Sequence, residues 1–219
     1  VNYTAILTSG NGSVAVANLG NGTYDIHVTY LENGKYNLST NNTVKLVVSK
    51  VDSSSFSINV TTENITVGDN STVNVVLPDD ATGNVTVKVD GEVVDTVAVT
   101  DGTADVTIPS MSAGNHTVEI AYSGDGKYNP VNQTKEITVS KKDTTPEITI
   151  PSDIEIGDNA TVDVKLPGDA GGNVTLKVDG GTVDTVPVEN GTASVKLPEL
   201  NAGNHTVEIA YSGDDKYKS

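Results

Sequence analysis

The chain has 219 residues, of which 36% are hydrophobic, and it contains no Cys, no Trp and a single Phe. The absence of Cys excludes disulfide bonds and thiolate metal sites, and a formal net charge of −16 makes binding to nucleic acid or anionic lipid unfavourable. No apolar run approaches the roughly 18 residues of a transmembrane helix, no signal peptide is present, and the first residue is Val1, so we expect a piece of a longer chain.

Three segments of the chain follow one pattern. Residues 113–125, Ala-Gly-Asn-His-Thr-Val-Glu-Ile-Ala-Tyr-Ser-Gly-Asp, recur unchanged 89 positions later, and a diverged copy occupies residues 19–30. Between residues 68–128 and 157–217, 43 of 61 positions are identical without a gap. A period near 90 residues is typical of small domains in tandem. We therefore expect the C-terminal part of a repeat at 1–50, a complete repeat at 51–141, and a repeat lacking its last strand at 142–219.

Hydrophobic and polar residues alternate along short, β-branched segments of the complete repeat. Val73 and Val75, for example, alternate with Thr72 and Asn74. This period of two predicts half-buried strands, and Asp-Gly pairs between them predict hairpin turns. We expect seven strands, at about residues 56–61, 71–77, 84–89, 93–99, 103–108, 115–122 and 131–139.

Seven short strands in each repeat predict an all-β fold of tandem immunoglobulin-like β-sandwich domains in a rod. The joints, residues 50–54 and 141–146, are too short to act as flexible linkers, so neighbouring domains should touch or nearly touch. The first strand is the exception to the repeat, because Phe56, Ile58 and Val60 do not share a register with Ile148 and Ile150 in the gapless alignment.

A corner motif supports the sandwich. Leu19-x-x-Gly22-x-Tyr24-x-Ile26 fits the motif in which a Tyr entering the sixth strand donates its hydroxyl back to the backbone. The later copies place His116 and His205 where Tyr24 stands. An imidazole can also donate to a carbonyl oxygen, so we expect both His to be structural corner residues.

These features resemble a known family. The Ser-Gly-Asp-x-Lys-Tyr ending, the Gly-Asn-His-Thr-Val strand and the 90-residue period are similar to the Ig-like repeats of adhesin-like surface proteins of methanogenic archaea, to which bacterial adhesin repeats are related. The resemblance covers essentially the whole chain and is specific for the repeat, not for a ligand. It implies an extracellular, cell-surface stalk or adhesin.

Asn-x-Ser/Thr triplets are unusually frequent, and they include 15 of the 21 Asn residues. One interpretation is that they are glycan acceptor sites of a secreted protein. The other is that Asn and Thr are both common at turns and strand starts. The triplets begin at Asn2, Asn11, Asn21, Asn37, Asn41, Asn59, Asn64, Asn70, Asn84, Asn115, Asn132, Asn159, Asn173, Asn190 and Asn204.

No catalytic constellation is present. The three His do not form a set, because His27 aligns with Glu119 and not with His116. The sequence contains no Gly-rich phosphate loop, His-Glu-x-x-His motif or nucleophile elbow. We therefore expect no enzyme and no organic cofactor.

Acidic residues are expected to gather at the domain poles that face the preceding domain. They could bind Ca²⁺, which takes 6–8 oxygen ligands, and stiffen the rod. Alternatively, they are solvated loop acids partly balanced by Lys50, Lys127, Lys141, Lys142 and Lys216, and no spacing matches a known calcium loop. The candidates are Asp52, Asp79, Asp80, Asp101 and Asp125 in the second repeat, and Asp143, Asp169, Glu189, Asp214 and Asp215 in the third.

Two further alternatives concern covalent and intermolecular bonds. An intramolecular Lys–Asn cross-link would need a Lys buried beside an acid, but Lys88 and Lys177 alternate outward from their Val neighbours. The incomplete first and third repeats could be completed by neighbouring repeats of the same long chain, or by other molecules in a head-to-tail filament.

We therefore expect a structural spacer of an extracellular adhesin-like protein or surface fibre. Each sandwich would add roughly 35–40 Å, from strands of about seven residues plus loops. The alternative is that the repeats themselves bind a glycan or protein on a host or partner cell, although no aromatic platform recurs. A third hypothesis makes them accessory spacers of a secreted enzyme.

Overall fold

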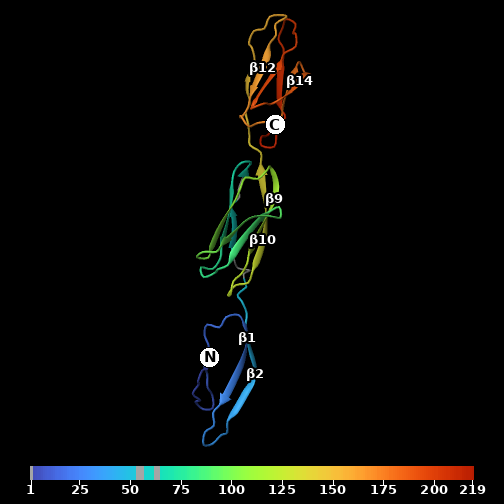
Figure 1. Cartoon of the computed structure of the whole chain (residues 1–219). Coiled ribbons are helices and arrows are strands. Elements are labelled where there is room, and N and C mark those ends of the chain that lie inside the picture. The colour runs from blue at the N-terminus through green and yellow to red at the C-terminus, as the bar shows by residue number, and fades with distance from the viewer. Residues whose placement is uncertain (1, 53–56, 62–64) are drawn as a thin grey trace.

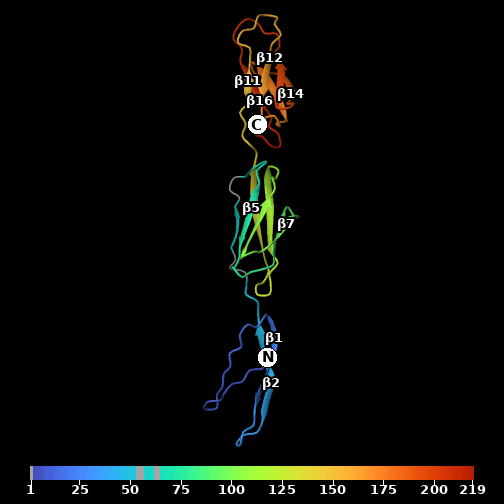
Figure 2. The same ribbon diagram turned by 60° about the vertical axis from the view of Figure 1, so that its left-hand side comes forward.

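The computed structural model describes residues 2–52, 57–61 and 65–219. Three bodies follow one another end to end, and the two views in Figure 1 and Figure 2 show the same extended arrangement. We refer to them as the N-terminal half-domain (residues 1–50), the central domain (51–141) and the C-terminal domain (142–219). All regular elements of the described part are strands, and it contains no helix long and apolar enough to cross a bilayer.

The N-terminal half-domain is an antiparallel hairpin with a long leading segment. Strand β1 (Gly22–Tyr30) pairs with β2 (Ser39–Val48), with a bulge after Ile26. In residues 2–21, which precede β1, the described backbone pairs in one isolated bridge between Thr8 and Asn11.

The central domain is a sandwich of two sheets. One sheet has the order β3-β5-β8 and the other the order β4-β10-β9-β6-β7. All seven predicted strands are confirmed, and the two-residue β4 is an addition that pairs in parallel with β10. The strands are β3 (Ser57–Thr61), β4 (Ile65–Thr66), β5 (Ser71–Val76), β6 (Asn84–Val89), β7 (Glu92–Ala98), β8 (Thr103–Ile108), β9 (Gly114–Tyr122) and β10 (Val131–Ser140).

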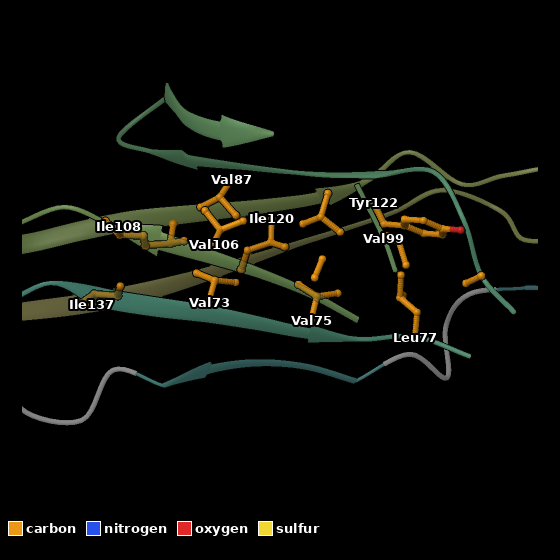
Figure 3. Packing of buried hydrophobic residues seen from close by; sticks show 14 of the residues in the cluster. Val73, Val75, Leu77, Val87, Val99, Val106, Ile108, Ile120, Tyr122 and Ile137 are labelled. Atoms are coloured by element: carbon orange, nitrogen blue, oxygen red, sulfur yellow. The ribbon is translucent and has the colours of Figure 1, made fainter. Parts of the chain in front are cut away.

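The core of the central domain lies between these two sheets. Val73 and Val75 of β5 and Val87 and Ile120 of the facing sheet have no exposed area. Figure 3 shows their side chains meeting between the sheets, with Tyr122 near one end. The alternation of buried and exposed residues along β5 and β8 is the period of two expected from the sequence.

The C-terminal domain repeats this sandwich with its own core. Its sheets have the orders β11-β12-β15 and β14-β13-β16. Val162, Val174 and Leu176 are fully buried and belong to a cluster separate from that of the central domain. The strands are β11 (Glu147–Thr149), β12 (Thr161–Lys165), β13 (Asn173–Val178), β14 (Gly181–Pro187), β15 (Thr192–Lys196) and β16 (Val207–Tyr211).

The backbone pairing explains the missing register of the first strand. Ile58 pairs with Val75, and Ile148 pairs with Val164. The two Val are 89 positions apart but the two Ile are 90 apart, so the C-terminal domain is one residue shorter between its first two paired strands.

The half-domain shows how far strand formation depends on partners. Val14 and Val16 align with Val106 and Ile108 of the central domain. The first pair is 46% and 42% exposed and lies outside any strand, whereas each of the second pair is 1% exposed on β8. β8 is paired with β5, and among residues 2–50 no strand takes the place of β5.

Candidate functional site at the joints between domains

A six-residue loop follows β9 at one end of the central domain. This Ser-Gly-Asp loop, residues 123–128, turns around Asp125. Oδ1 of Asp125 accepts the backbone N–H groups of Lys127 and Tyr128, both at 2.7 Å. Its Oδ2 accepts the N–H of Thr82 at 2.8 Å. Burial alone would raise the pKa of Asp125, but these hydrogen bonds outweigh it and lower the pKa to about 2.

A second carboxylate ties the loop to its neighbour. The hydroxyl of Tyr128 donates to Oδ1 of Asp80 at 2.6 Å, and Nζ of Lys127 donates to Oδ2 at 2.5 Å. The hydrogen bonds from Lys127 and then Tyr128 lower the pKa of Asp80. Tyr128 is 4% exposed, so the ring anchors the loop in the core while its hydroxyl fixes the carboxylate.

The C-terminal domain repeats the arrangement in residues 212–217. The hydroxyl of Tyr217 and Nζ of Lys216 donate to Asp169 at 2.7 and 2.8 Å. The hydrogen bond from Lys216 and then that from Tyr217 lower the pKa of Asp169 to about 2. Asp214 accepts the N–H of Gly171 at 2.6 Å, as Asp125 accepts that of Thr82.

Each Ser-Gly-Asp loop also binds the chain that enters its domain. Nζ of Lys50 donates to the backbone oxygen of Asp125 at 2.5 Å. The N–H of Val51 donates to the oxygen of Lys127 at 2.8 Å, and the N–H of Asn129 donates to the oxygen of Val51 at 3.0 Å. The first residues of the joint are therefore added to the central domain as a short parallel bridge.

The second joint is bound in the same way. Nζ of Lys141 donates to the backbone oxygen of Asp214. The N–H of Lys142 donates to the oxygen of Lys216 at 2.7 Å, and the N–H of Lys218 donates to the oxygen of Lys142 at 3.0 Å. β10 ends at Ser140, so the last strand of one domain is followed at once by residues held by the next.

Lys142 contacts both domains that it connects. Its backbone pairs with Tyr217, while its Nζ lies 3.2 Å from where a Cβ on Gly68 of the central domain would be. Asp69, the residue after Gly68, is also affected by this lysine. Its pKa is lowered mainly by hydrogen bonds from Thr66 and further by the positive charge of Lys142. An ion pair at 2.8 Å between Lys218 and Asp143 adds to this joint.

The predicted corner residues are confirmed. The Tyr24 hydroxyl donates to the oxygen of Gly20 at 2.9 Å. Nε2 of His116 lies 2.9 Å from the oxygen of Ser112, the equivalent position. His205 contacts the oxygen of Asn201 in the same way.

The structure brings some of the calcium candidates together, but two of these carboxylates are paired with lysines. Asp80 and Asp125 meet at one loop and Asp169 and Asp214 at its copy, and their oxygens bind Lys, Tyr and backbone N–H groups as described above. Within residues 2–52, 57–61 and 65–219, no three His, Cys, Asp or Glu side chains are placed to hold a metal ion. The remaining candidates are exposed: Asp52, Asp79, Asp101, Asp143, Glu189 and Asp215.

The Asn-x-Ser/Thr triplets lie on the surface. Every Asn that begins such a triplet and whose side chain is described is exposed, on strands as well as in loops. Asn64 is outside the described residues, as is the side chain of Asn59. Exposure is a requirement for a glycan acceptor and is equally expected of a polar surface residue.

Lys88 and Lys177 occupy equivalent strand positions. Each is partly buried and stands opposite a glutamate in the register, Glu119 and Glu208 respectively. Their surroundings are therefore half-solvated, unlike the buried site that a Lys–Asn cross-link requires.

Sequence reasoning missed the role of Lys50 and Lys141. From the sequence they count among the cations expected to balance nearby acids, but their ammonium groups bind backbone oxygens. The available signal was their recurrence as the first residue of each joint, 91 positions apart.

Comparison with known proteins identifies a family for most of the chain. The model of the family "Bacterial Ig-like domain (group 3)" matches residues 58–140 and 148–219. The chain belongs to this Ig-like family. A search of curated proteins finds no match.

Solved structures similar to this Ig-like chain include several multidomain proteins. The fibronectin(III)-like modules of Clostridium thermocellum CbhA are 10% identical, with a TM-score of 0.32, 74% of this chain and 88% of that chain covered. β-Glucuronidase 3 of Bacteroides uniformis is 14% identical (TM-score 0.31; 76% and 24% covered), so this chain spans about a quarter of that enzyme. A chimeric titin Z1Z2 tandem is 16% identical (TM-score 0.26; 71% and 97% covered).

Proposed function

We propose that this chain is a structural spacer of an extracellular, adhesin-like surface protein or surface fibre, in which consecutive Ig-like domains are held in line by bonded joints. The observation that carries the proposal is the repeated clamp at the joints. Lys50 and Lys141 each donate to the Ser-Gly-Asp loop of the following domain, and the next residue pairs with that loop through its backbone.

The clamp leaves little free chain between domains. β2 ends at Val48, so Ser49 alone separates it from Lys50, and Ser140 is directly followed by Lys141. A linker of this length cannot behave as a random coil, because both of its ends are fixed by hydrogen bonds. The proposed mechanism is mechanical. Each domain adds length to the rod, and each joint keeps the next domain in line with the one before it.

The surface composition fits an extracellular setting. The net charge of −16 keeps a long array soluble, and exposed Asn-x-Ser/Thr triplets would carry glycans in a secreted protein. Intact mass of the protein from its native source, before and after glycosidase treatment, tests the glycans. A mass equal to that of the bare chain would remove this part of the proposal.

The spacer role is tested by measuring the motion between the central and C-terminal domains. The chain has no Cys, so Glu92→Cys with Thr182→Cys places spin labels on two exposed positions, one on each domain. We expect a narrow distance distribution by pulsed electron resonance, which becomes broader when Lys141→Ala is added. Lys196→Ala, which removes an exposed positive charge from β15, is the matched control and should leave the distribution narrow.

Two outcomes would count against this function. A broad distribution in the chain with native Lys141 would mean that the joint is flexible and cannot set the direction of the rod. Specific binding of the bare fragment on a glycan array would instead favour the alternative in which the repeats are themselves the adhesive surface.

A further inference from the structure

The corner histidines have two oxygen partners each. Nδ1 of His116 lies 2.7 Å from Oδ2 of Asp90, and Nε2 lies 2.9 Å from the backbone oxygen of Ser112. The side chain of His116 is 13% exposed, whereas that of Asp90 is 52% exposed. Asp90 is itself fixed, because its Oδ1 accepts the N–H of Thr117 at 2.8 Å.

The C-terminal domain has the same arrangement. Nδ1 of His205 lies 2.7 Å from Oδ2 of Asp179, and Nε2 lies 2.9 Å from the oxygen of Asn201. Oδ1 of Asp179 accepts the N–H of Thr206 at 2.9 Å. The central and C-terminal domains therefore both hold a corner His between a carboxylate and a backbone oxygen.

Two oxygen partners require two donors. A carboxylate and a peptide carbonyl can only accept, whereas a neutral imidazole has one N–H and one lone pair. A neutral ring would therefore point its lone pair at one of these oxygens. Only the imidazolium form, with an N–H on each nitrogen, satisfies both contacts at once.

The half-domain provides the comparison. At the equivalent position, Tyr24 makes the single bond to Gly20 that a phenol hydroxyl can donate. That bond needs one donor and one acceptor, which the hydroxyl of Tyr24 and the backbone oxygen of Gly20 supply. Tyr24 therefore closes the corner with one contact, whereas each His closes it with two.

We propose that His116 and His205 are protonation-dependent locks. In the charged form, each imidazole donates to a backbone oxygen of the corner loop and to the carboxylate of an Asp in a hairpin turn, and so holds the loop and the turn together. Loss of the proton as pH rises releases one of these two hydrogen bonds. In the central domain the lock connects the segment before β9 with the β6–β7 turn. In the C-terminal domain it connects residues 201–205 with the β13–β14 turn.

The charges around the ring agree with this assignment. Hydrogen bonding to Asp90 and then to the oxygen of Ser112 raises the pKa of His116, and the bond from His116 lowers that of Asp90. On β10 the residue opposite His116 is Ile137, whereas Glu136 and Lys135 stand opposite the next two residues of β9. On β6, Lys88 stands opposite Glu119, three residues along β9 from the ring.

The second lock has the same electrostatics. Hydrogen bonding to Asp179 and then to Asn201 raises the pKa of His205, and the bond from His205 lowers the pKa of Asp179. On β13, Lys177 stands opposite Glu208, three residues along the chain from the ring. Among the described residues, Asp179 is the one carboxylate bonded to this imidazole.

The direction of the pH dependence follows from these shifts. The stabilisation due to a His with a raised pKa is complete below its unfolded value of about 6.5 and is lost as pH rises through the folded pKa. The stabilisation due to an Asp with a lowered pKa is present above about 3.9 and is lost as pH falls through its folded pKa. Both locks should therefore be strongest at mildly acidic pH.

The test combines His titration with melting of the full chain. We expect the ring protons of His116 and His205 to titrate above the ordinary value by NMR, and Tm to fall between pH 6 and pH 8.5. In the double variant His116→Tyr/His205→Tyr, which copies the Tyr24 corner, we expect Tm not to fall over this pH range. The variant Asp90→Asn/Asp179→Asn keeps the imidazoles but removes the carboxylates, so both His pKa values should drop and the fall in Tm should shrink.

The proposal would be overturned by either of two results. Titration of both rings at or below the ordinary His value would show that the neutral form is held. An equal fall in Tm in the native chain and in both double variants would assign the pH dependence to other groups. If the Tyr variant does not fold, the Asn variant and the NMR titration still decide.

Discussion

Val87 and Ile120 stand directly opposite each other on the neighbouring strands β6 and β9, and neither has any exposed area. Together they form part of the wall that faces β5 across the sandwich. Ile120→Ala should lower the free energy of unfolding of the central domain by about 2–5 kcal/mol, because it removes buried methyl groups and leaves a cavity. Calorimetry or urea denaturation of the full chain measures this loss.

The same substitution should leave the C-terminal domain almost unchanged. Its core is a separate cluster that includes Val174 and Leu176, with no buried residue shared with the central domain. We therefore expect one thermal transition to move and another to stay. A parallel decrease of both transitions would show that the two cores unfold as one cooperative unit.

Two glycines in tight turns allow the cost of backbone strain to be separated from the cost of steric contact. Gly91 has φ +86°, and a Cβ added there would meet no atom within 4 Å. Gly102 has φ +69°, and a Cβ there would lie 2.6 Å from the oxygen of Pro78. Gly91→Ala should cost about 1–2 kcal/mol of stability from the left-handed conformation alone. Gly102→Ala should cost more, because the backbone around Pro78 must also move.

Urea denaturation measures the loss of unfolding free energy in each variant, and Gly91→Ala is the control for Gly102→Ala. The difference between them isolates the contact, since both turns demand positive φ. Equal losses in the two variants would mean that the loop containing Pro78 yields without cost.

The strands and the corner could be predicted because each corresponds to a pattern of residues close together in the sequence. Alternation along β5 and β8 is visible residue by residue, and the spacing from Gly22 to Tyr24 defines the corner. The contacts at the joints correspond to no such pattern. Lys50 binds the backbone oxygen of Asp125, and every residue type offers a backbone oxygen.

Other features depend on partners distant in the chain. Asp90 lies 26 positions before His116, and only the folded hairpin brings its carboxylate to the ring. Val14 and Val16 resemble Val106 and Ile108 in sequence, yet they remain exposed and lie outside the strands of the described residues. A pattern thus reports what a segment can form, and the pairing decides whether it does.

Acid should weaken the Ser-Gly-Asp loop of the central domain through Asp125. Its pKa is lowered to about 2, so its contribution is present above about 3.9 and is lost as pH falls toward 2. Asp125→Asn loses part of the acceptor set for three N–H groups, and we expect a lower Tm at pH 7 and a smaller difference from the native chain at pH 2.5.

Asp79→Asn is the matched control for this change. Asp79 is an exposed neighbour in the same region and has no hydrogen bond or ion pair to the described residues. Its substitution should alter Tm little at either pH. An Asp125 variant that differs from the native chain by the same amount at both pH values would refute the role of the ionised carboxylate.

Calcium provides a direct test of what neutralises the carboxylates at the joints. Asp80 is bound by Lys127 and Asp169 by Lys216, so a divalent ion would have to displace an ammonium group already in place. We expect equal Tm values in excess chelator and in millimolar Ca²⁺. Lys127→Met/Lys216→Met removes both ammonium groups and frees carboxylate oxygens, so a Ca²⁺-dependent rise in Tm should be larger in this variant than in the native chain. A rise in the native chain that the variant does not exceed would show that Ca²⁺ binds elsewhere at the poles, among the other acidic loop residues.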